Sequence, residues 1–226
     1  MTLRPLDDLS AAGWLLRDDA PTVLRTHLGP SGFAAYARVL HSPTGQGVTG
    51  QGDRFEGHLD DRLLGALVDV LSRHTSTPRE CFFALWEGYG DIHGGEAAGF
   101  LGAFSGPTRW PGRIFIKEKP APPPPPAFPA HVMDGPLLVV DDESYFVFTG
   151  PLDQAGQWGA ARWTGGAPRD INSPNRMWPA DRAWCVTTSV EGTWTGVGGS
   201  ESLIAALLHD DRLEVVRQRY DEGAVR

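Results

Sequence analysis

One stretch of the sequence concentrates the residue types that recognise ligands. Between Trp158 and Trp194 lie five of the eight tryptophans of the chain, with four arginines interleaved. Aromatic rings and guanidinium planes carried on loops provide a large contact area with little loss of conformational entropy. The stretch therefore favours a recognition surface for a protein or a small ligand. The best candidates for binding are Trp158, Trp163, Arg176, Trp178 and Arg182.

The same stretch also has a structural interpretation, in which the tryptophans pack a core and the arginines fix turns. Trp184 and Trp194 lie in predicted strands, so we expect them in the core. The other three tryptophans are flanked by glycine and proline, which are typical of loops, and we expect them at the surface. These three are Trp158, Trp163 and Trp178.

Acid–base chemistry requires imidazole or carboxylate groups, and the first ones to consider are His41, His58 and Asp181. His58 lies between Glu56 and the pair Asp60 and Asp61, a group that could also hold a hard metal ion. The alternative is that the two aspartates serve the dipole of the helix that follows. The seven histidines are scattered, and no nucleophile–base or metal-ligand spacing is present. The sequence therefore predicts no metal and no cofactor.

Charge and hydropathy exclude two classes of partner. The 20 basic and 28 acidic residues give a net charge of −8, without a basic block or tail. Nucleic-acid binding draws on clustered lysine and arginine, so we expect no nucleic-acid partner. No apolar run exceeds six residues, whereas a membrane span needs roughly 20. The first residues lack the apolar segment of a signal peptide, and we expect a cytoplasmic protein with no membrane partner. The oligomeric state is left open.

Two compositional features bear on the setting of the protein. Eighteen of the twenty basic residues are arginine, a bias typical of GC-rich genomes. The two cysteines, Cys81 and Cys185, lie 104 residues apart in apolar stretches, without the paired spacing of a structural zinc site. We expect both to be buried free thiols that act as small hydrophobic residues.

Two helices and several strands must position the candidate residues. The apolar residues of 59–74 fall mostly on one face of a helix, and a second helix spans 201–209 after Ser200, a good N-cap. Residues 150–182 are predicted to be loop. The sequence therefore predicts an α+β fold, with an antiparallel or mixed sheet, two main helices and long Gly/Pro-rich loops. The predicted strands are 33–41, 81–86, 113–117, 137–140, 145–149, 183–190, 193–197 and 213–216.

A proline-rich stretch interrupts the middle of the chain. Seven of the ten residues from Pro120 to Pro129 are proline, which dictates an extended polyproline conformation that cannot join a sheet. Two domains divided there would each have a marginal core, so we predict a single domain, 1–226, with a polyproline insertion near 119–131. The insertion is either a spacer or a ligand for an aromatic groove.

Several phrases of the sequence carry a family resemblance when they are taken in order. They are residues 33–41, 73–88, 145–152 and 197–200, together with the S-P-N-x-x-W-P-x-D-R-A-W-C-V phrase of 173–186. The chain resembles a family of hypothetical proteins from actinobacteria and other GC-rich bacteria over about residues 30–215. The resemblance favours one domain and implies no particular activity. Two positions depart from it: Ser42-Pro43 replaces Pro-Ala, and Thr188-Ser189 replaces an acidic residue.

Three hypotheses of function remain from the sequence. The leading one is a cytoplasmic binding or interaction module, not an enzyme, that presents its Trp/Arg-rich loops to a protein or small ligand. The second is an enzyme whose acid–base groups meet only in the fold, with His41, His58 and Asp181 as the candidates. The third is a bacterial toxin-immunity-type protein, which an acidic single domain would fit. The sequence leaves open whether any catalysis occurs.

Overall fold

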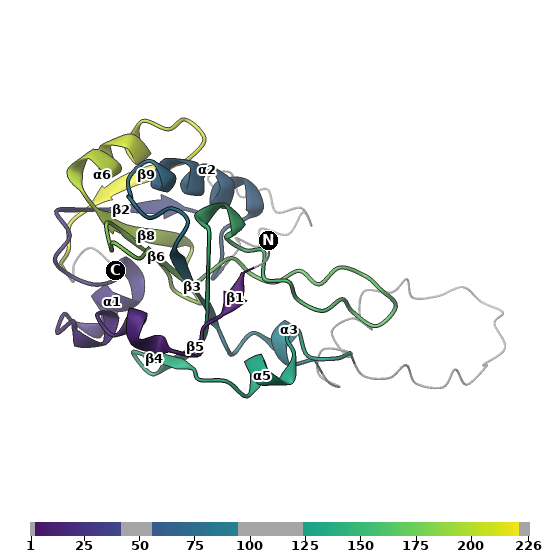
Figure 1. Ribbon diagram of the computed structural model, residues 1–226. Coiled ribbons are helices and arrows are strands. Elements are labelled where there is room, and N and C mark those ends of the chain that lie inside the picture. The colour runs from purple at the N-terminus through teal and green to yellow at the C-terminus, as the bar shows by residue number, and fades with distance from the viewer. Residues whose placement is uncertain (1–2, 42–55, 95–123, 222–226) are drawn as a thin grey trace, which may run out of the picture. The chain divides into compact units, whose positions relative to one another are not determined.

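The computed structural model describes residues 3–41, 56–94 and 124–221 (Figure 1). The strand predicted at 113–117 and the first part of the proline-rich insertion, residues 119–123, lie outside the described residues. The chain divides into two compact units. The first unit comprises Met1–Glu87, Pro136–Trp158 and Asn172–Arg226, and the second comprises Gly88–Gly135 and Gly159–Ile171. That residues 1–226 form a single domain stays a prediction.

The described strands of the first unit form one antiparallel sheet of nine strands, which confirms the predicted α+β class. Its order is β1-β5-β3-β6-β7-β8-β2-β9, and β4 pairs with β5 beside this path. The strands are β1 (Arg4–Pro5), β2 (Ala35–Leu40), β3 (Cys81–Trp86), β4 (Leu138–Val140), β5 (Glu143–Gly150), β6 (Arg176–Pro179), β7 (Cys185–Thr188), β8 (Trp194–Gly199) and β9 (Val215–Gln218).

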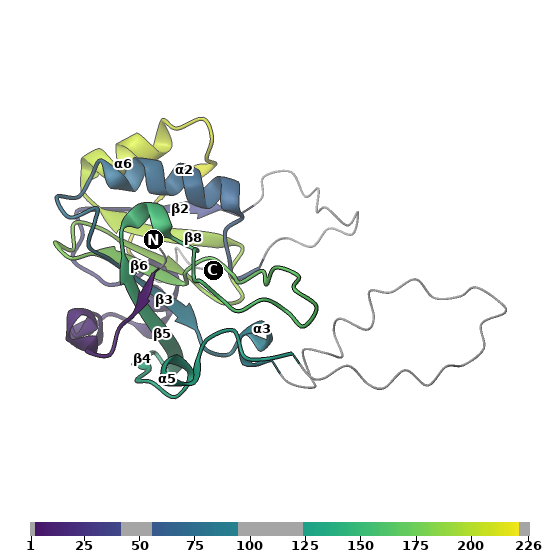
Figure 2. The same ribbon diagram turned by 45° about the vertical axis from the view of Figure 1, so that its right-hand side comes forward.

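Helices cover both faces of this sheet. The two predicted helices, α2 (Asp61–Ser72) and α6 (Glu201–Leu208), lie side by side on one face (Figures 1 and 2). The opposite face carries α1 (Thr22–Leu28) and the short helices η1 (Leu9–Ala12) and η2 (Leu15–Arg17), which the sequence did not predict. One more turn, η3 (Leu152–Gln154), follows β5.

The two predicted helices begin at side-chain caps. The Asp60 carboxylate accepts a hydrogen bond from the Leu63 amide at 2.8 Å, and the Ser200 hydroxyl accepts one from the Leu203 amide at 3.2 Å. Such a cap satisfies one of the backbone donors that the first helical turn leaves without a partner. Asp60 therefore has a structural role at the start of α2. This agrees with the alternative given above, in which Asp60 and Asp61 serve the helix and do not bind a metal ion.

Strand β6 lies in the middle of the sheet, where the sequence predicted loop. It pairs with β3 on one side and with β7 on the other, and all four of its residues are buried. The strand is short, it begins with an arginine and it ends with Pro179. Only Arg176 and Met177 pair with β7, so the missing amide hydrogen of Pro179 interrupts nothing on that side. Because two of its four residues are an arginine and a proline, β6 does not form the apolar run by which a buried strand is predicted from sequence.

Strands β4 and β5 form the predicted hairpin, but its turn is tighter than expected. Val140 pairs directly with Glu143, so the loop has two residues instead of the four predicted from Asp141 to Ser144. Both loop residues have positive φ, 55° for Asp141 and 67° for Asp142. Two successive positive φ angles define a type I′ turn, whose twist suits an antiparallel hairpin. The tight turn sets where the Asp141 side chain points.

The second unit contains two short helices, α3 (Gly90–His93) and α5 (Ala130–Met133). Its described segments are joined by backbone hydrogen bonds. The Ala127 amide donates to the Ile92 carbonyl at 2.7 Å, and the Ala161 amide donates to the Ala127 carbonyl at 2.7 Å. The end of the proline-rich insertion is thereby bonded on both sides within this unit.

Candidate functional site

Two of the three tryptophans expected at the surface are buried, and that expectation is wrong for them. Trp178 has no exposed surface, because β6 places its ring against Phe82, with the ring centroids 5.5 Å apart. Trp158 is 5% exposed, and its indole Nε1 donates to the Asn172 carbonyl at 2.9 Å. Trp184 is buried in the core as expected, whereas Trp194, also expected there, is only partly buried. The structural interpretation holds for most of this stretch.

Trp163 lies in the second unit and is partly buried. The Arg169 guanidinium lies over its ring, 4.1 Å from the centroid, which is a cation–π contact. Arg169 also donates to the carbonyls of Asp91 and Pro125, each at 2.6 Å. This arginine therefore ties three segments of the second unit together. Beside them lies an apolar hollow of about 630 Å³, whose lining includes Pro125, Phe128 and Met133.

Arg176, predicted as a surface binding residue, is instead buried in the first unit, and that prediction of exposure is wrong. Its side chain is 2% exposed. Nη1 donates to the Arg25 carbonyl at 3.2 Å, and the guanidinium lies 5.5 Å from the centroid of the Tyr145 ring. Its ion-pair partner is Asp141, with Nη2 and Oδ2 separated by 3.8 Å. The alternation of β6 turns this side chain toward α1 and away from solvent.

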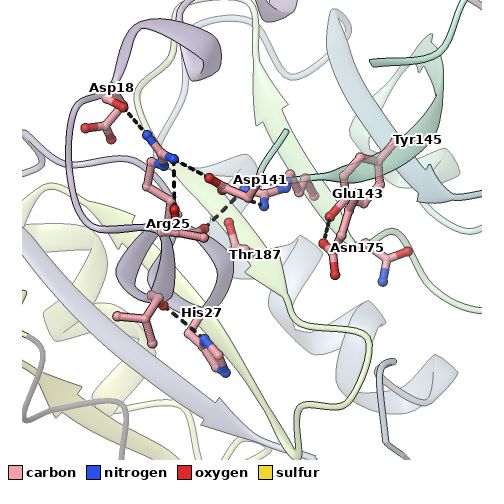
Figure 3. A network of polar contacts seen from close by, with 12 residues as sticks. Asp18, Arg25, His27, Asp141, Glu143, Tyr145, Asn175 and Thr187 are labelled. Carbon is pink, nitrogen blue, oxygen red and sulfur yellow. Dashed lines mark hydrogen bonds and ion pairs between the residues drawn. The ribbon is translucent and has the colours of Figure 1, made fainter. Parts of the chain in front are cut away.

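A second arginine reaches the same carboxylate. Arg25 of α1 forms an ion pair with Asp141 through Nη2 and donates from Nη1 to the carbonyl of Asp18 (Figure 3). The Arg25 side chain is 23% exposed, whereas that of Asp141 is 1% exposed. Arg25, Asp141 and Arg176 are called the arginine–aspartate cluster below. It joins α1, the β4–β5 turn and β6, and it places two cations against one carboxylate.

The surroundings of the cluster shift the pKa of Arg176 and those of two neighbouring groups. Burial by itself lowers the pKa of Arg176, but the neighbouring Tyr145 and Asp141 raise it above its ordinary value. Burial also raises the pKa of the Tyr145 phenol, whose hydroxyl donates to the Glu143 carboxylate. The Cys185 thiol is buried beside Thr187, and burial raises its pKa to about 11. Arg176 is thus a cation, and Cys185 is an inert thiol at neutral pH.

His41 belongs to a separate buried group on the other face of the sheet. Its Nε2 lies 2.7 Å from the Thr195 hydroxyl, which in turn lies 2.8 Å from the Thr188 hydroxyl. Side chains alternate along β8, so Thr195 and position 199 share one face of the sheet. A Cβ atom at Gly199 would meet Leu203 of α6, so Thr195 points to the face that α6 covers. His41, Thr188 and Thr195 are called the His41 group below. Its hydrogen bonds link the end of β2 to β8 and β7.

The other two acid–base candidates also have structural partners. The Asp181 carboxylate accepts hydrogen bonds from the Ser76 amide and hydroxyl, both at 2.7 Å, and from the Thr75 hydroxyl at 2.8 Å. Burial alone would raise the pKa of Asp181, but these hydrogen bonds lower it below its ordinary value. His58 contacts the Glu56 carbonyl through Nδ1 at 3.3 Å. The three candidates therefore have different bonding partners. Within the described ranges no three His, Cys, Asp or Glu side chains gather as metal ligands.

Arg182 is the one predicted binding residue of the first unit that is exposed. It follows β6 with a φ of 54°, and its guanidinium lies 5.7 Å from the centroid of the Trp14 ring. Trp14 is held edge-on against Phe33, with the centroids 6.4 Å apart. Trp14 was not among the predicted binding residues, although a tryptophan followed by Arg17 and two aspartates was a usable signal.

Trp14 lines an open polar hollow of about 410 Å³, called the Trp14 hollow below. The Asp18 side chain holds its wall, since the Ser31 hydroxyl donates to Oδ1 at 2.9 Å and the Ala20 amide donates to the same oxygen at 3.0 Å. The walls are thus fixed by hydrogen bonds and carry both signs of charge. The lining residues are Trp14, Arg17, Asp18, Asp19, Ala20, Pro30 and Ser31.

Comparisons with known proteins return no match. No family model matches the chain, and neither a curated protein nor a solved structure matches it significantly. In the part of the chain that the structure describes, no helix is long and apolar enough to cross a membrane. Inference about function therefore rests on the residues of the chain itself, foremost the arginine–aspartate cluster and the Trp14 hollow.

Proposed function

We propose that this chain is a cytoplasmic binding module that recognises a protein partner through the Trp14 hollow and the Arg182 side chain, whose guanidinium lies over the Trp14 ring. The observation that carries the proposal is the Arg182–Trp14 pair, in which an exposed guanidinium lies 5.7 Å from a tryptophan ring at the edge of a hollow. Tryptophan and arginine are the side chains most enriched at the energetic centres of protein interfaces.

The charges around the hollow suit a protein surface better than a nucleic acid. Arg17 and Asp19 are both exposed, so the hollow offers one cation and one carboxylate for complementary partners. Leu16, next to them, is 57% exposed and adds apolar area. A net charge of −8 repels phosphate backbones. A mixed polar rim around an aromatic residue is the usual anatomy of a protein–protein interface.

The rigidity of the hollow also supports binding. Asp18 fixes the loop of residues 18–20 to Ser31, and the Trp14 ring is braced by Phe33. A preformed surface loses little conformational entropy when a partner docks, so more of the contact energy appears as affinity. The three acid–base candidates, by contrast, are bonded to turns and strand ends, which favours binding over catalysis.

The experiment places a photo-crosslinking amino acid at Arg17 and, as a control, at Asp69 on α2, which covers the opposite face of the sheet. Each protein is irradiated in cells of its source organism and its adducts are identified by mass spectrometry. We expect one discrete protein adduct from position 17 that position 69 does not form. The adduct should weaken when Arg182→Asn is added, a change that removes the guanidinium and tolerates the positive φ.

Four results would contradict the proposal. Identical adducts from both positions, or an adduct from position 17 that persists undiminished with Arg182→Asn, would remove the assigned surface. A small metabolite retained by the wild-type protein and lost with Arg182→Asn would make the hollow a ligand pocket instead. Turnover of such a metabolite that is abolished by His58→Ala, with folding intact, would favour the enzyme alternative.

A further inference from the structure

The arginine–aspartate cluster is assembled from elements that are distant in sequence. Arg25 and Asp141 are 116 residues apart, and Arg176 comes from a third element, β6. The two guanidiniums are held by α1 and by the centre of the sheet, whereas the carboxylate is carried by a hairpin turn. Movement of the turn alone would therefore withdraw the carboxylate and leave both cations in place.

The hairpin that carries the carboxylate lies at an edge of the described sheet. Strand β4 has three residues and pairs only with β5 among the described strands; Leu138 and Val140 are buried, whereas the central Val139 is 54% exposed. Both turn residues, Asp141 and Asp142, adopt the left-handed backbone that favours glycine. A short edge strand that is hydrogen-bonded on one side only opens locally at a lower free-energy cost than the central strands, because fewer backbone hydrogen bonds must break.

The carboxylate does not satisfy the donors that surround it. Asp141 Oδ2 lies 3.8 Å from Arg176 Nη2, and it has no hydrogen-bond partner among the described residues. The Nε atoms of Arg25 and Arg176 are likewise buried without a hydrogen-bond partner in the described part of the chain. A guanidinium and a carboxylate normally form hydrogen bonds of about 2.7–2.9 Å, often two in parallel. The Asp141 carboxylate is thus hydrogen-bonded to Arg25, whereas it lies beyond hydrogen-bonding distance of Arg176.

We propose that Arg25, Arg176 and Tyr145 form a carboxylate-binding site that Asp141 occupies as an internal ligand. A small free monocarboxylate binds there when the Asp141 carboxylate is absent or withdrawn. The planar guanidinium fork recognises a planar carboxylate, and the Tyr145 ring closes one side of the Arg176 guanidinium. The wild-type turn therefore keeps the site closed. This inference is independent of the proposed function of the Trp14 hollow.

The test replaces Asp141 by glycine and measures whether acetate restores the thermal stability that the Asp141 carboxylate provides. Asp141→Gly removes the carboxylate and relieves the backbone, since glycine accepts a φ of 55°. The melting temperature is measured at constant ionic strength and constant pH while acetate replaces chloride. We expect a melting temperature below that of the wild type in chloride, and a saturable rise with acetate toward the wild-type value. A ligand that binds only the folded state produces such a rise.

Three controls isolate the site. Asp142→Gly changes the neighbouring positive-φ residue, which is exposed, and should show no response to acetate. Asp141→Asn fills the position with a neutral side chain of the same size and should also show none. The double variant Asp141→Gly/Arg176→Met should lose the response, because one of the two cations is gone. Sulfate replaces acetate in a parallel titration of Asp141→Gly.

The outcomes decide the proposal in each case. A saturable acetate response confined to Asp141→Gly supports the site. No response, a response equal to that of Asp142→Gly, or a sulfate response as large as the acetate response would overturn it. If Asp141→Gly does not fold in chloride, its refolding yield becomes the readout. A yield restored by acetate and not by sulfate supports the proposal, and a yield unchanged by acetate overturns it.

Discussion

Two buried polar groups in the described part of the first unit, the His41 group and the arginine–aspartate cluster, lie on opposite faces of one sheet and keep their polar atoms buried in different ways. The His41 group consists of an imidazole and two hydroxyls that bond to one another at 2.7 and 2.8 Å. The arginine–aspartate cluster consists of two guanidiniums and one carboxylate, with several polar atoms that lack a hydrogen-bond partner among the described residues. One group is well satisfied by hydrogen bonds, and the other depends on opposite charges.

This difference has an energetic consequence. Replacing a buried ion pair by apolar residues of similar size is often neutral or stabilising, whereas removing one partner leaves an uncompensated charge. Removing one hydroxyl from a group of hydrogen bonds costs less, because it does not take away the counter-ion of a buried charge. The cluster is therefore more sensitive to single substitutions than the His41 group. A charged group that contributes little net stability is also the better candidate for a function, which favours the arginine–aspartate cluster as the carboxylate site.

The largest effect is expected for Asp141→Asn, which removes the negative charge from the cluster. The amide has the same size and tolerates the positive φ, so backbone strain does not change. Arg176, with its side chain 2% exposed, then has no carboxylate partner among the described residues. We expect a loss of about 3–5 kcal/mol in the free energy of unfolding, measured by urea denaturation.

A double variant checks whether that loss comes from the uncompensated charge. Asp141→Asn/Arg176→Met replaces the arginine by an unbranched apolar side chain that fits a similar volume. We expect it to recover more than half of the stability lost in the single variant. A double variant less stable than Asp141→Asn alone would mean that Arg176 stabilises mainly through its packing on Tyr145.

The matching change in the His41 group is Thr195→Val, which keeps the shape of the side chain and removes its hydroxyl. His41 Nε2 and the Thr188 hydroxyl both lose their bond to this oxygen. We expect a loss of about 1–3 kcal/mol in the free energy of unfolding, because two buried polar atoms are left without this partner. A loss equal to that of Asp141→Asn would break the distinction between the two groups.

How far the sequence predicts the molecule depends on the range of the contacts involved. Local patterns correctly predicted α2, β3 and α6, because periodicity, caps and apolar runs are read within about fifteen residues. The bounds of β3, Cys81–Trp86, match the prediction at both ends. Short elements such as α1 and β6 were not predicted, since seven and four residues give little periodic signal. The described core of the first unit thus follows from its longest elements.

The candidate sites were less predictable than the fold. Arg176 and Trp178 have the composition of a recognition loop, but pairing of β6 with β3 and β7 buries them. The ion pair of Arg25 with Asp141 joins residues that are 116 positions apart, so no local sequence pattern predicts it. Arg182 lies only six residues beyond Arg176 and is exposed, because β6 ends at Pro179. Exposure in this stretch is decided by where a four-residue strand stops.

A surface carboxylate sharpens the contrast with the buried one. Asp181 is exposed, and its hydrogen bonds from Ser76 and Thr75 lower its pKa below the ordinary value. Its stabilising effect is present above the unfolded-state pKa of about 4 and is lost as the pH falls through the lower folded-state pKa. Asp181→Asn should therefore be less stable than the wild type at pH 7, by no more than about 1 kcal/mol because the site is solvated. The difference should close below about pH 4. Urea denaturation across pH 3–7 measures it, and a pH-independent gap would assign the effect to geometry instead of charge.

The smallest effect is expected at Asp142, the other residue of the β4–β5 turn. Asp142 shares the positive φ of Asp141 but is exposed, and the described structure records no ion pair for it. Asp142→Gly relieves the left-handed backbone, which costs a non-glycine residue about 1–2 kcal/mol, and removes no buried charge. Glycine also raises the entropy of the unfolded chain, so the net stabilisation should be about 0.5–1 kcal/mol. Adjacent residues of one turn should thus respond in opposite directions, with Asp141→Asn destabilising and Asp142→Gly stabilising. Destabilisation by Asp142→Gly in urea denaturation would mean that the Asp142 side chain holds the turn, and the hairpin would then be less free to open than its short edge strand indicates.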